Sequence, residues 1–78
     1  MNKERILKLA LDAGLLNYVD NETPRRYFID GYADLEEVEE FAQLIVRECA
    51  GIVTDAVDHR EPASTYADKI RQHFGVEE

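Results

Sequence analysis

Residues 34–59 read DLEEVEEFAQLIVRECAGIVTDAVDH, and the fold is decided by this stretch. Its apolar residues recur in alternating steps of three and four, a spacing that places them along one side of an α-helix. Asp34, followed three residues later by Glu37, is a capping-box variant, and the acidic first turns suit the positive end of the helix dipole. The pattern therefore predicts one long central helix over residues 34–59.

The predicted central helix carries more apolar surface than burial on one side requires. A stripe about 100° wide is enough for that, yet further apolar residues flank the main row. Two short neighbouring helices can cover only part of it, so we expect a helical homo-oligomer, most simply a dimer, to cover the rest. Gly51 lowers helix propensity by roughly 1 kcal/mol, which suggests either close backbone approach or a local kink. The predicted oligomer interface consists of Leu35, Val38, Phe41, Ala42, Ile45, Cys49 and Ile52.

Shorter helices are expected on both sides of the central one. Asn2 can cap a helix over residues 3–13, with an apolar side made of Ile6, Leu7, Ala10, Leu11 and Ala13, and Gly14 can end it in the left-handed conformation. Pro62 fits the first turn of a third helix, and Gly75 can end that helix in the same way. Residues 1–78 thus read as a single small all-α domain of three helices.

The stretch between the first two helices, residues 17–33, reads NYVDNETPRRYFIDGYA and has no helical period. Pro24 disfavours helix at the residue before it, and Asp30-Gly31 is a turn signal. Two short extended pieces, residues 18–19 and 26–29, can pair as a ribbon, which would have to lie on the helices because an isolated ribbon is marginal in water. We expect a compact, aromatic-rich loop.

Composition restricts the classes of partner and compartment. The chain has 78 residues and a net charge of −8, which opposes general attraction to nucleic acid or to anionic membranes. Cys49 is the only cysteine, so no internal disulfide can form, and a lone thiol fits a reducing compartment. Neither a signal peptide nor an apolar run of roughly 18 residues is found. We expect a soluble cytoplasmic protein that binds neither membrane nor nucleic acid directly.

No catalytic signature stands out, and we expect no enzymatic activity, no cofactor and no metal. His59 and His73 lie near predicted helix C-termini, where the dipole favours cationic side chains. Cys49 lies within the apolar row, which favours core packing over a nucleophile, since a nucleophile needs a base and an electropositive setting. A metal site remains an alternative because Asp55 and His59 share a helix face, with Asp58 and Glu61 nearby, although the spacing is not a known ligand pattern.

The unusual chemistry is concentrated in the loop, where two adjacent arginines stand beside aromatic residues. Such a group can bind a protein, because arginine and tyrosine are frequent interface hot spots, or it can hold a phosphate. Alternatively, the aromatics only fix the loop and the arginines pair with Glu36, Glu39 or Glu40. The acidic helix face can also imitate a phosphate backbone. The predicted ligand- or partner-binding residues are Arg25, Arg26, Tyr27, Phe28 and Tyr32.

Two phrases of the chain, EFAQLIVRECA at residues 40–50 and IRQHFGV at residues 70–76, resemble a family of small uncharacterised accessory proteins of tailed bacteriophages. The opening residues 1–14 and the segment 27–31 are similar too. The resemblance implies a phage-encoded protein made in the infected cell, and it implies no catalytic residues. We therefore expect a non-enzymatic protein that binds and modulates or inhibits a host protein, such as an immune component. The alternatives are an oligomeric sponge for a nucleotide immune signal and an acidic nucleic-acid mimic.

Overall fold

The computed structural model describes residues 1–21 and 23–76. Within those residues the chain is mostly helical, with three α-helices and one two-stranded sheet. This confirms the predicted helical class with one long central helix, whereas the all-α description is incomplete because of the sheet. In chain order the elements are α1 (Lys3–Asp12), β1 (Leu16–Tyr18), β2 (Tyr27–Ile29), α2 (Leu35–Asp58), the 3₁₀ turn η1 (Ala63–Thr65) and α3 (Tyr66–Phe74).

The long helix α2 begins with the predicted capping box. The side chain of Asp34 accepts a hydrogen bond from the Glu36 amide at 2.9 Å, and the Asp34 amide donates to Glu37 Oε2 at 2.9 Å. The helix then continues unbroken past Gly51. Apart from its chain neighbours and its own helix backbone, no atom of the described residues lies within 4 Å of the position that a Gly51 side-chain carbon would take, so the expected close backbone approach is not found within the single chain.

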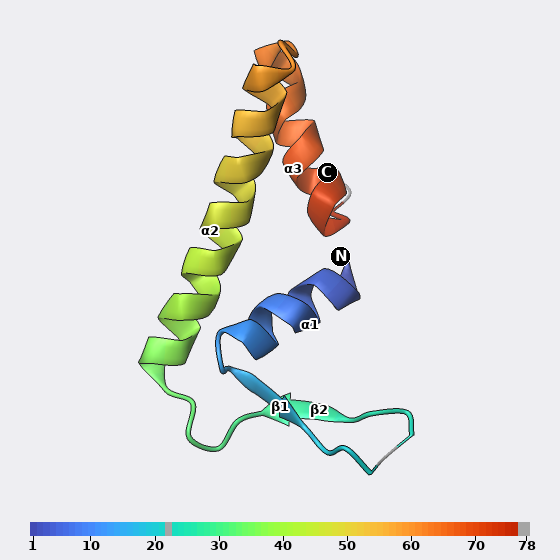
Figure 1. Ribbon diagram of the computed structural model, residues 1–78, viewed down its shortest axis with the longest axis vertical. Coiled ribbons are helices and arrows are strands. Elements are labelled where there is room, and N and C mark those ends of the chain that lie inside the picture. The colour runs from blue at the N-terminus through green and yellow to red at the C-terminus, as the bar shows by residue number, and fades with distance from the viewer. Residues whose placement is uncertain (22, 77–78) are drawn as a thin grey trace.

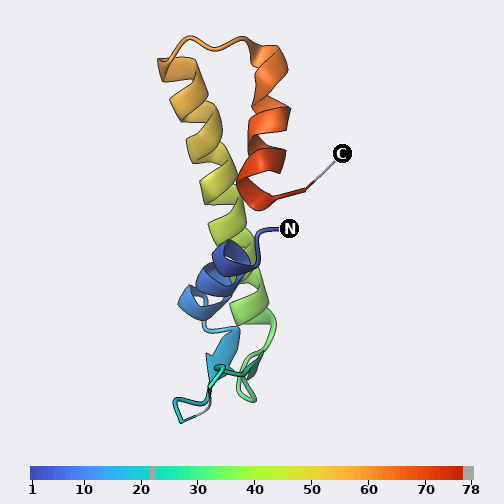
Figure 2. The ribbon, with the colours of Figure 1, turned by 90° about the vertical axis from the view of Figure 1, so that its right-hand side faces the viewer.

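The two shorter helices lie along different halves of α2. Figure 1 shows α3 returning antiparallel beside the C-terminal half, while α1 lies against the N-terminal half. The view turned by 90° gives the same arrangement, with the hairpin beyond α1 (Figure 2). The start of α1 meets the end of α3, where the Asn2 amide donates to the Phe74 carbonyl at 2.5 Å. The two short helices therefore follow one another along α2 instead of forming a layer around it.

The ends of the short helices agree with the sequence-based expectation. The Asn2 side chain accepts from the Arg5 amide at 3.1 Å and caps α1. Gly14 and Gly75 both have left-handed backbones, with φ values of 79° and 70°. The Val76 amide donates to the Arg71 carbonyl at 2.8 Å, which is the hydrogen bond of a Schellman motif at a left-handed helix end. Pro62, expected in the first turn of the third helix, instead lies just before it with an extended backbone, and the helix begins with the 3₁₀ turn η1 before it becomes α-helical.

The predicted loop contains an antiparallel hairpin. Leu16 pairs with Ile29 and Tyr18 with Tyr27, so the predicted pairing of two extended pieces is confirmed. Their bounds differ from the prediction, because the strands cover residues 16–18 and 27–29 instead of 18–19 and 26–29. Backbone hydrogen bonds connect the hairpin to α1. The Leu15 amide donates to the Ala10 carbonyl of α1, and the Leu15 carbonyl accepts from the Asp30 amide just after β2, both at 2.9 Å.

The core is thin for a chain of this length. The radius of gyration is 15.2 Å, whereas a compact chain of this length has about 11.5 Å. Leu9 lies off the apolar side predicted for the first helix, yet it is buried. In the described ranges, no helix is long and apolar enough to cross a membrane. The buried apolar residues are Leu9, Ala10, Ala13, Ala56 and Phe74.

Candidate interaction surfaces

The hairpin holds an ordered aromatic and cationic group. The Arg25 guanidinium lies 4.2 Å from the centre of the Tyr18 ring, a cation–π distance. The Tyr18 and Tyr27 rings, which face each other across the two strands, have centroids 5.8 Å apart. Arg25 thus stacks on Tyr18. The arrangement fixes Arg25 at the surface beside a tyrosine.

The predicted binding residues do not share one face. Successive residues of a strand point to opposite sides of a sheet, so Tyr27 and Phe28 point apart. Tyr27 is half-buried and lines a hollow with α1 residues, which gives it a packing role. Phe28 and Tyr32, by contrast, are 41% and 96% exposed. Arg26, between Arg25 and Tyr27, is also exposed.

The turn after β2 fixes the backbone at Tyr32, whose side chain is exposed. Asp30 Oδ1 accepts from the Tyr32 amide at 2.8 Å, and Asp30 Oδ2 accepts from the Asn17 side-chain amide at 3.2 Å. Ile29, which sequence reasoning did not select, is 62% exposed beside it. We use the term hairpin end for four exposed residues that lie on both faces of this region: Arg25, Phe28, Ile29 and Tyr32.

A polar cluster that the sequence analysis missed joins the three helices. Glu48, in the middle of α2, accepts from Arg5 Nη1 of α1 at 3.1 Å, and its other oxygen lies 2.6 Å from His73 Nε2 of α3. An ionised carboxylate can only accept, so His73 Nε2 carries the hydrogen in this pair. We call this cluster the Glu48 bridge. Its sequence signal is a charged residue at helical spacing among apolar residues that face the other helices.

The Glu48 bridge perturbs the carboxylate at its centre. The hydrogen bond from His73 lowers the pKa of Glu48 below its ordinary value, and the charge of Arg5 adds to this, while partial burial acts in the opposite direction. The Glu48 and His73 side chains are only 24% and 27% exposed. His73 is therefore occupied in joining α3 to α2.

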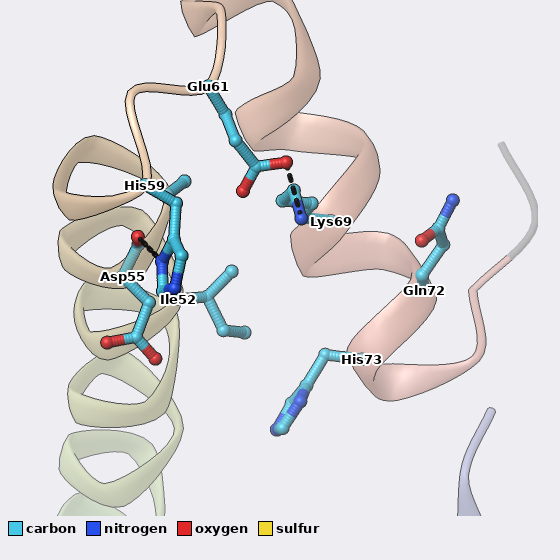
Figure 3. Close-up of a pocket in the computed structure, with 8 residues that line it drawn as sticks. Ile52, Asp55, His59, Glu61, Lys69, Gln72 and His73 are labelled. Carbon is cyan, nitrogen blue, oxygen red and sulfur yellow. Dashed lines mark hydrogen bonds and ion pairs between the residues drawn. The ribbon is translucent and has the colours of Figure 1, made fainter.

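An open groove of about 540 Å³ lies between α2 and α3 near their connection. Figure 3 shows His59 lying along α2 while His73 extends from α3. His59 Nδ1 lies 2.7 Å from the Asp55 carbonyl oxygen, and Lys69 Nζ lies 2.8 Å from Glu61 Oε1, so these polar groups are already paired. In the part of the chain that the structure describes, no three histidine, cysteine or acidic residues are grouped closely enough to hold a metal ion.

The residues predicted for the oligomer interface divide into two sets. Phe41, Ile45, Cys49 and Ile52 are half-buried on the sides that α1 and α3 cover, whereas Leu35, Val38 and Ala42 are exposed. At about 100° per residue, the exposed side of α2 continues to residues that the prediction omitted. Val46 and Val57 are 66% and 54% exposed there. We call this side the exposed stripe: Leu35, Ala42, Val46, Ala50 and Val57, with Val38 at its margin; Val53, on the same side, is half-buried.

No protein-family model, curated protein or solved structure matches the chain. The resemblance to phage accessory proteins therefore stays a prediction.

Proposed function

We propose that the chain is a non-enzymatic interaction protein that binds a partner protein through the hairpin end. The observation that carries the proposal is Tyr32, whose side chain is 96% exposed and whose backbone amide donates to Asp30 Oδ1. Phe28 and Ile29 expose further apolar surface nearby. Aromatic anchors with little conformational freedom are typical of binding hot spots. The proposed function therefore rests on exposed side chains of the hairpin end that do not contribute to the core.

The partner that fits this surface is a protein with an apolar recess and an acidic rim for Arg25. The resemblance to phage accessory proteins supports a host protein, whose activity the chain would modulate or inhibit. The net charge of −8 supports a protein over a nucleic acid, because a polyanion would be repelled.

The proposal includes self-association into a homo-oligomer, most simply a dimer. Leu35, Val38 and Val46 keep 68%, 50% and 66% of their exposure in the single chain. Contiguous exposed apolar residues on a soluble protein mark contact surfaces.

Affinity capture from host lysate tests partner binding, followed by direct titration of the captured protein in purified form. We expect Tyr32→Ala and Arg25→Ala to weaken the titrated affinity at least about tenfold, the usual effect of a hot-spot truncation. Val76→Ala is the control, because Val76 is an exposed apolar residue that follows the end of α3, outside the hairpin. Equal affinity for the wild type and both hairpin variants would exclude the hairpin end as the binding surface.

A nucleotide sponge is the second candidate, and the stack of Arg25 on Tyr18 favours it. A base can stack on such an aromatic while the guanidinium holds a phosphate. Thermal-shift measurements with cyclic and linear nucleotides separate the candidates. A rise in melting temperature that Arg25→Ala abolishes supports the sponge, whereas no rise with any nucleotide excludes it.

A further inference from the structure

We propose that two copies of the chain pair antiparallel through the exposed stripe of α2, with Val46 on the two-fold axis. The inference rests on the proposed homo-oligomer and is independent of partner binding at the hairpin end. It specifies the relative orientation and the register of the two α2 helices, which the apolar pattern and the predicted interface residues do not determine. Three features of α2 lead to it: the symmetry of the stripe, the distribution of its charges and its length.

The exposed stripe is self-complementary about Val46. In a two-fold contact, if one residue meets a second, the second also meets the first. With Val46 opposite itself, Leu35 lies 11 positions before the axis and Val57 lies 11 positions after it, so these two face each other. Ala42 and Ala50, four positions on either side, face each other in the same way. Leu35, Ala42, Val46, Ala50 and Val57 therefore meet only apolar residues, whereas Val38 at the margin faces Thr54 and the half-buried Val53 faces Glu39. The small alanine pairs allow close approach beside Val46.

The charges of α2 select the antiparallel orientation. Its first turns are acidic, with Glu36, Glu39 and Glu40 close together. Parallel pairing would place these carboxylates beside their own copies, in a chain that already has a net charge of −8. Antiparallel pairing separates the two acidic ends by about 24 Å at 1.5 Å per residue, beyond the screening length of about 8–10 Å. Each acidic end then lies beside the less acidic second half of the other α2, where Asp55 and Asp58 are accompanied by Arg60.

The length of α2 sets the strength of the contact. A helix of 24 residues offers an interface about 36 Å long and one helix wide. Such a contact lies at the low end of protein interfaces, where association is reversible. We therefore expect a dimer that dissociates on dilution, with two hairpin ends facing outward at opposite ends.

Disulfide trapping tests orientation and register in a Cys49→Ala background, which removes the native thiol. A disulfide requires Cβ atoms about 3.5–4.5 Å apart. We expect Val46→Cys to form a linked dimer by itself. Leu35→Cys and Val57→Cys should link several-fold faster when mixed than when either is alone. If Leu35→Cys links equally well to itself the pairing is parallel, and if Val46→Cys does not link the stripe is not the interface; either result overturns the inference.

Sedimentation of the full chain supplies a second, independent measurement. Val46→Asp places two carboxylates together at the axis and should raise the dimer dissociation constant at least about tenfold. Ile29→Asp is the matched control, because Ile29 is 62% exposed against 66% for Val46 and lies on β2. A wild-type chain that stays monomeric at several hundred micromolar, or equal effects of both variants, would overturn the inference. Tyr32→Ala should leave sedimentation unchanged, so loss of partner binding and loss of dimerisation are distinguishable.

Discussion

Gly75 combines a left-handed backbone with a close approach of the N-terminus. A side-chain carbon at this position would lie 2.9 Å from the Asn2 nitrogen, and φ is 70°. Gly75→Ala should lower the free energy of unfolding by about 1–2 kcal/mol for the backbone conformation, and further because Asn2 must move. Urea denaturation followed by circular dichroism measures the loss. Gly14→Ala is the control, since φ is 79° but the nearest atom would be Glu37 Cγ at 3.7 Å. Equal losses in the two variants would show that the approach of Asn2 is unimportant.

Glu48 and His73 are expected to be coupled energetically. Hydrogen bonds to charged groups contribute about 1.5–3 kcal/mol when shielded, and partial exposure reduces this to about 1 kcal/mol. A double-mutant cycle with Glu48→Gln and His73→Ala should measure that coupling. The exposed pair Lys8 and Asp12, joined at 2.9 Å, is the control and should show almost none. A coupling no larger than that of the exposed pair would contradict a structural role for the Glu48 bridge.

At the scale of elements, α2 continues as a regular helix through Gly51, a residue that disfavours helix. Gly51 lies within it with open space around the missing side chain, so alanine fits without contact. Gly51→Ala should raise the free energy of unfolding by up to about 1 kcal/mol, the difference in helix propensity. The melting temperature measured by circular dichroism should rise accordingly. A decrease would mean that Gly51 contacts something that the single chain does not contain.

The elements differ in how far the sequence predicts them. The caps at Asn2, Asp34 and Gly75 depend on local chemistry, and all three were predicted. The hairpin register was not, because it depends on how Tyr18 and Tyr27 meet across two strands and on α1 beneath them. The same holds for the candidate sites. Exposure of Tyr32 agrees with its selection from composition, while the roles of Glu48 and of the exposed stripe depend on where α1 and α3 lie along α2.

At the scale of the whole molecule, stability depends on few contacts. The longest dimension is 46 Å against 21 Å for the shortest, and α1 and α3 cover different halves of α2. The Glu48 bridge lies where these halves meet and ties both short helices to the same carboxylate. Protonation of that carboxylate should therefore weaken the whole fold instead of one end.

The pH dependence of unfolding follows from this position. The pKa of Glu48 is lowered from its ordinary 4.5, chiefly by the hydrogen bond from His73, so the unfolded chain binds a proton at Glu48 more readily than the folded chain. The contribution to stability is therefore complete above pH 4.5 and is lost as the pH falls through the lowered pKa. Urea midpoints of wild type and Glu48→Gln, measured from about pH 7 to about pH 3, should differ most at neutral pH and converge in acid. Comparison with this variant removes the effects of the other carboxylates, which both chains share. A difference that stays constant over the whole range would show that the charge of Glu48 contributes nothing to the fold.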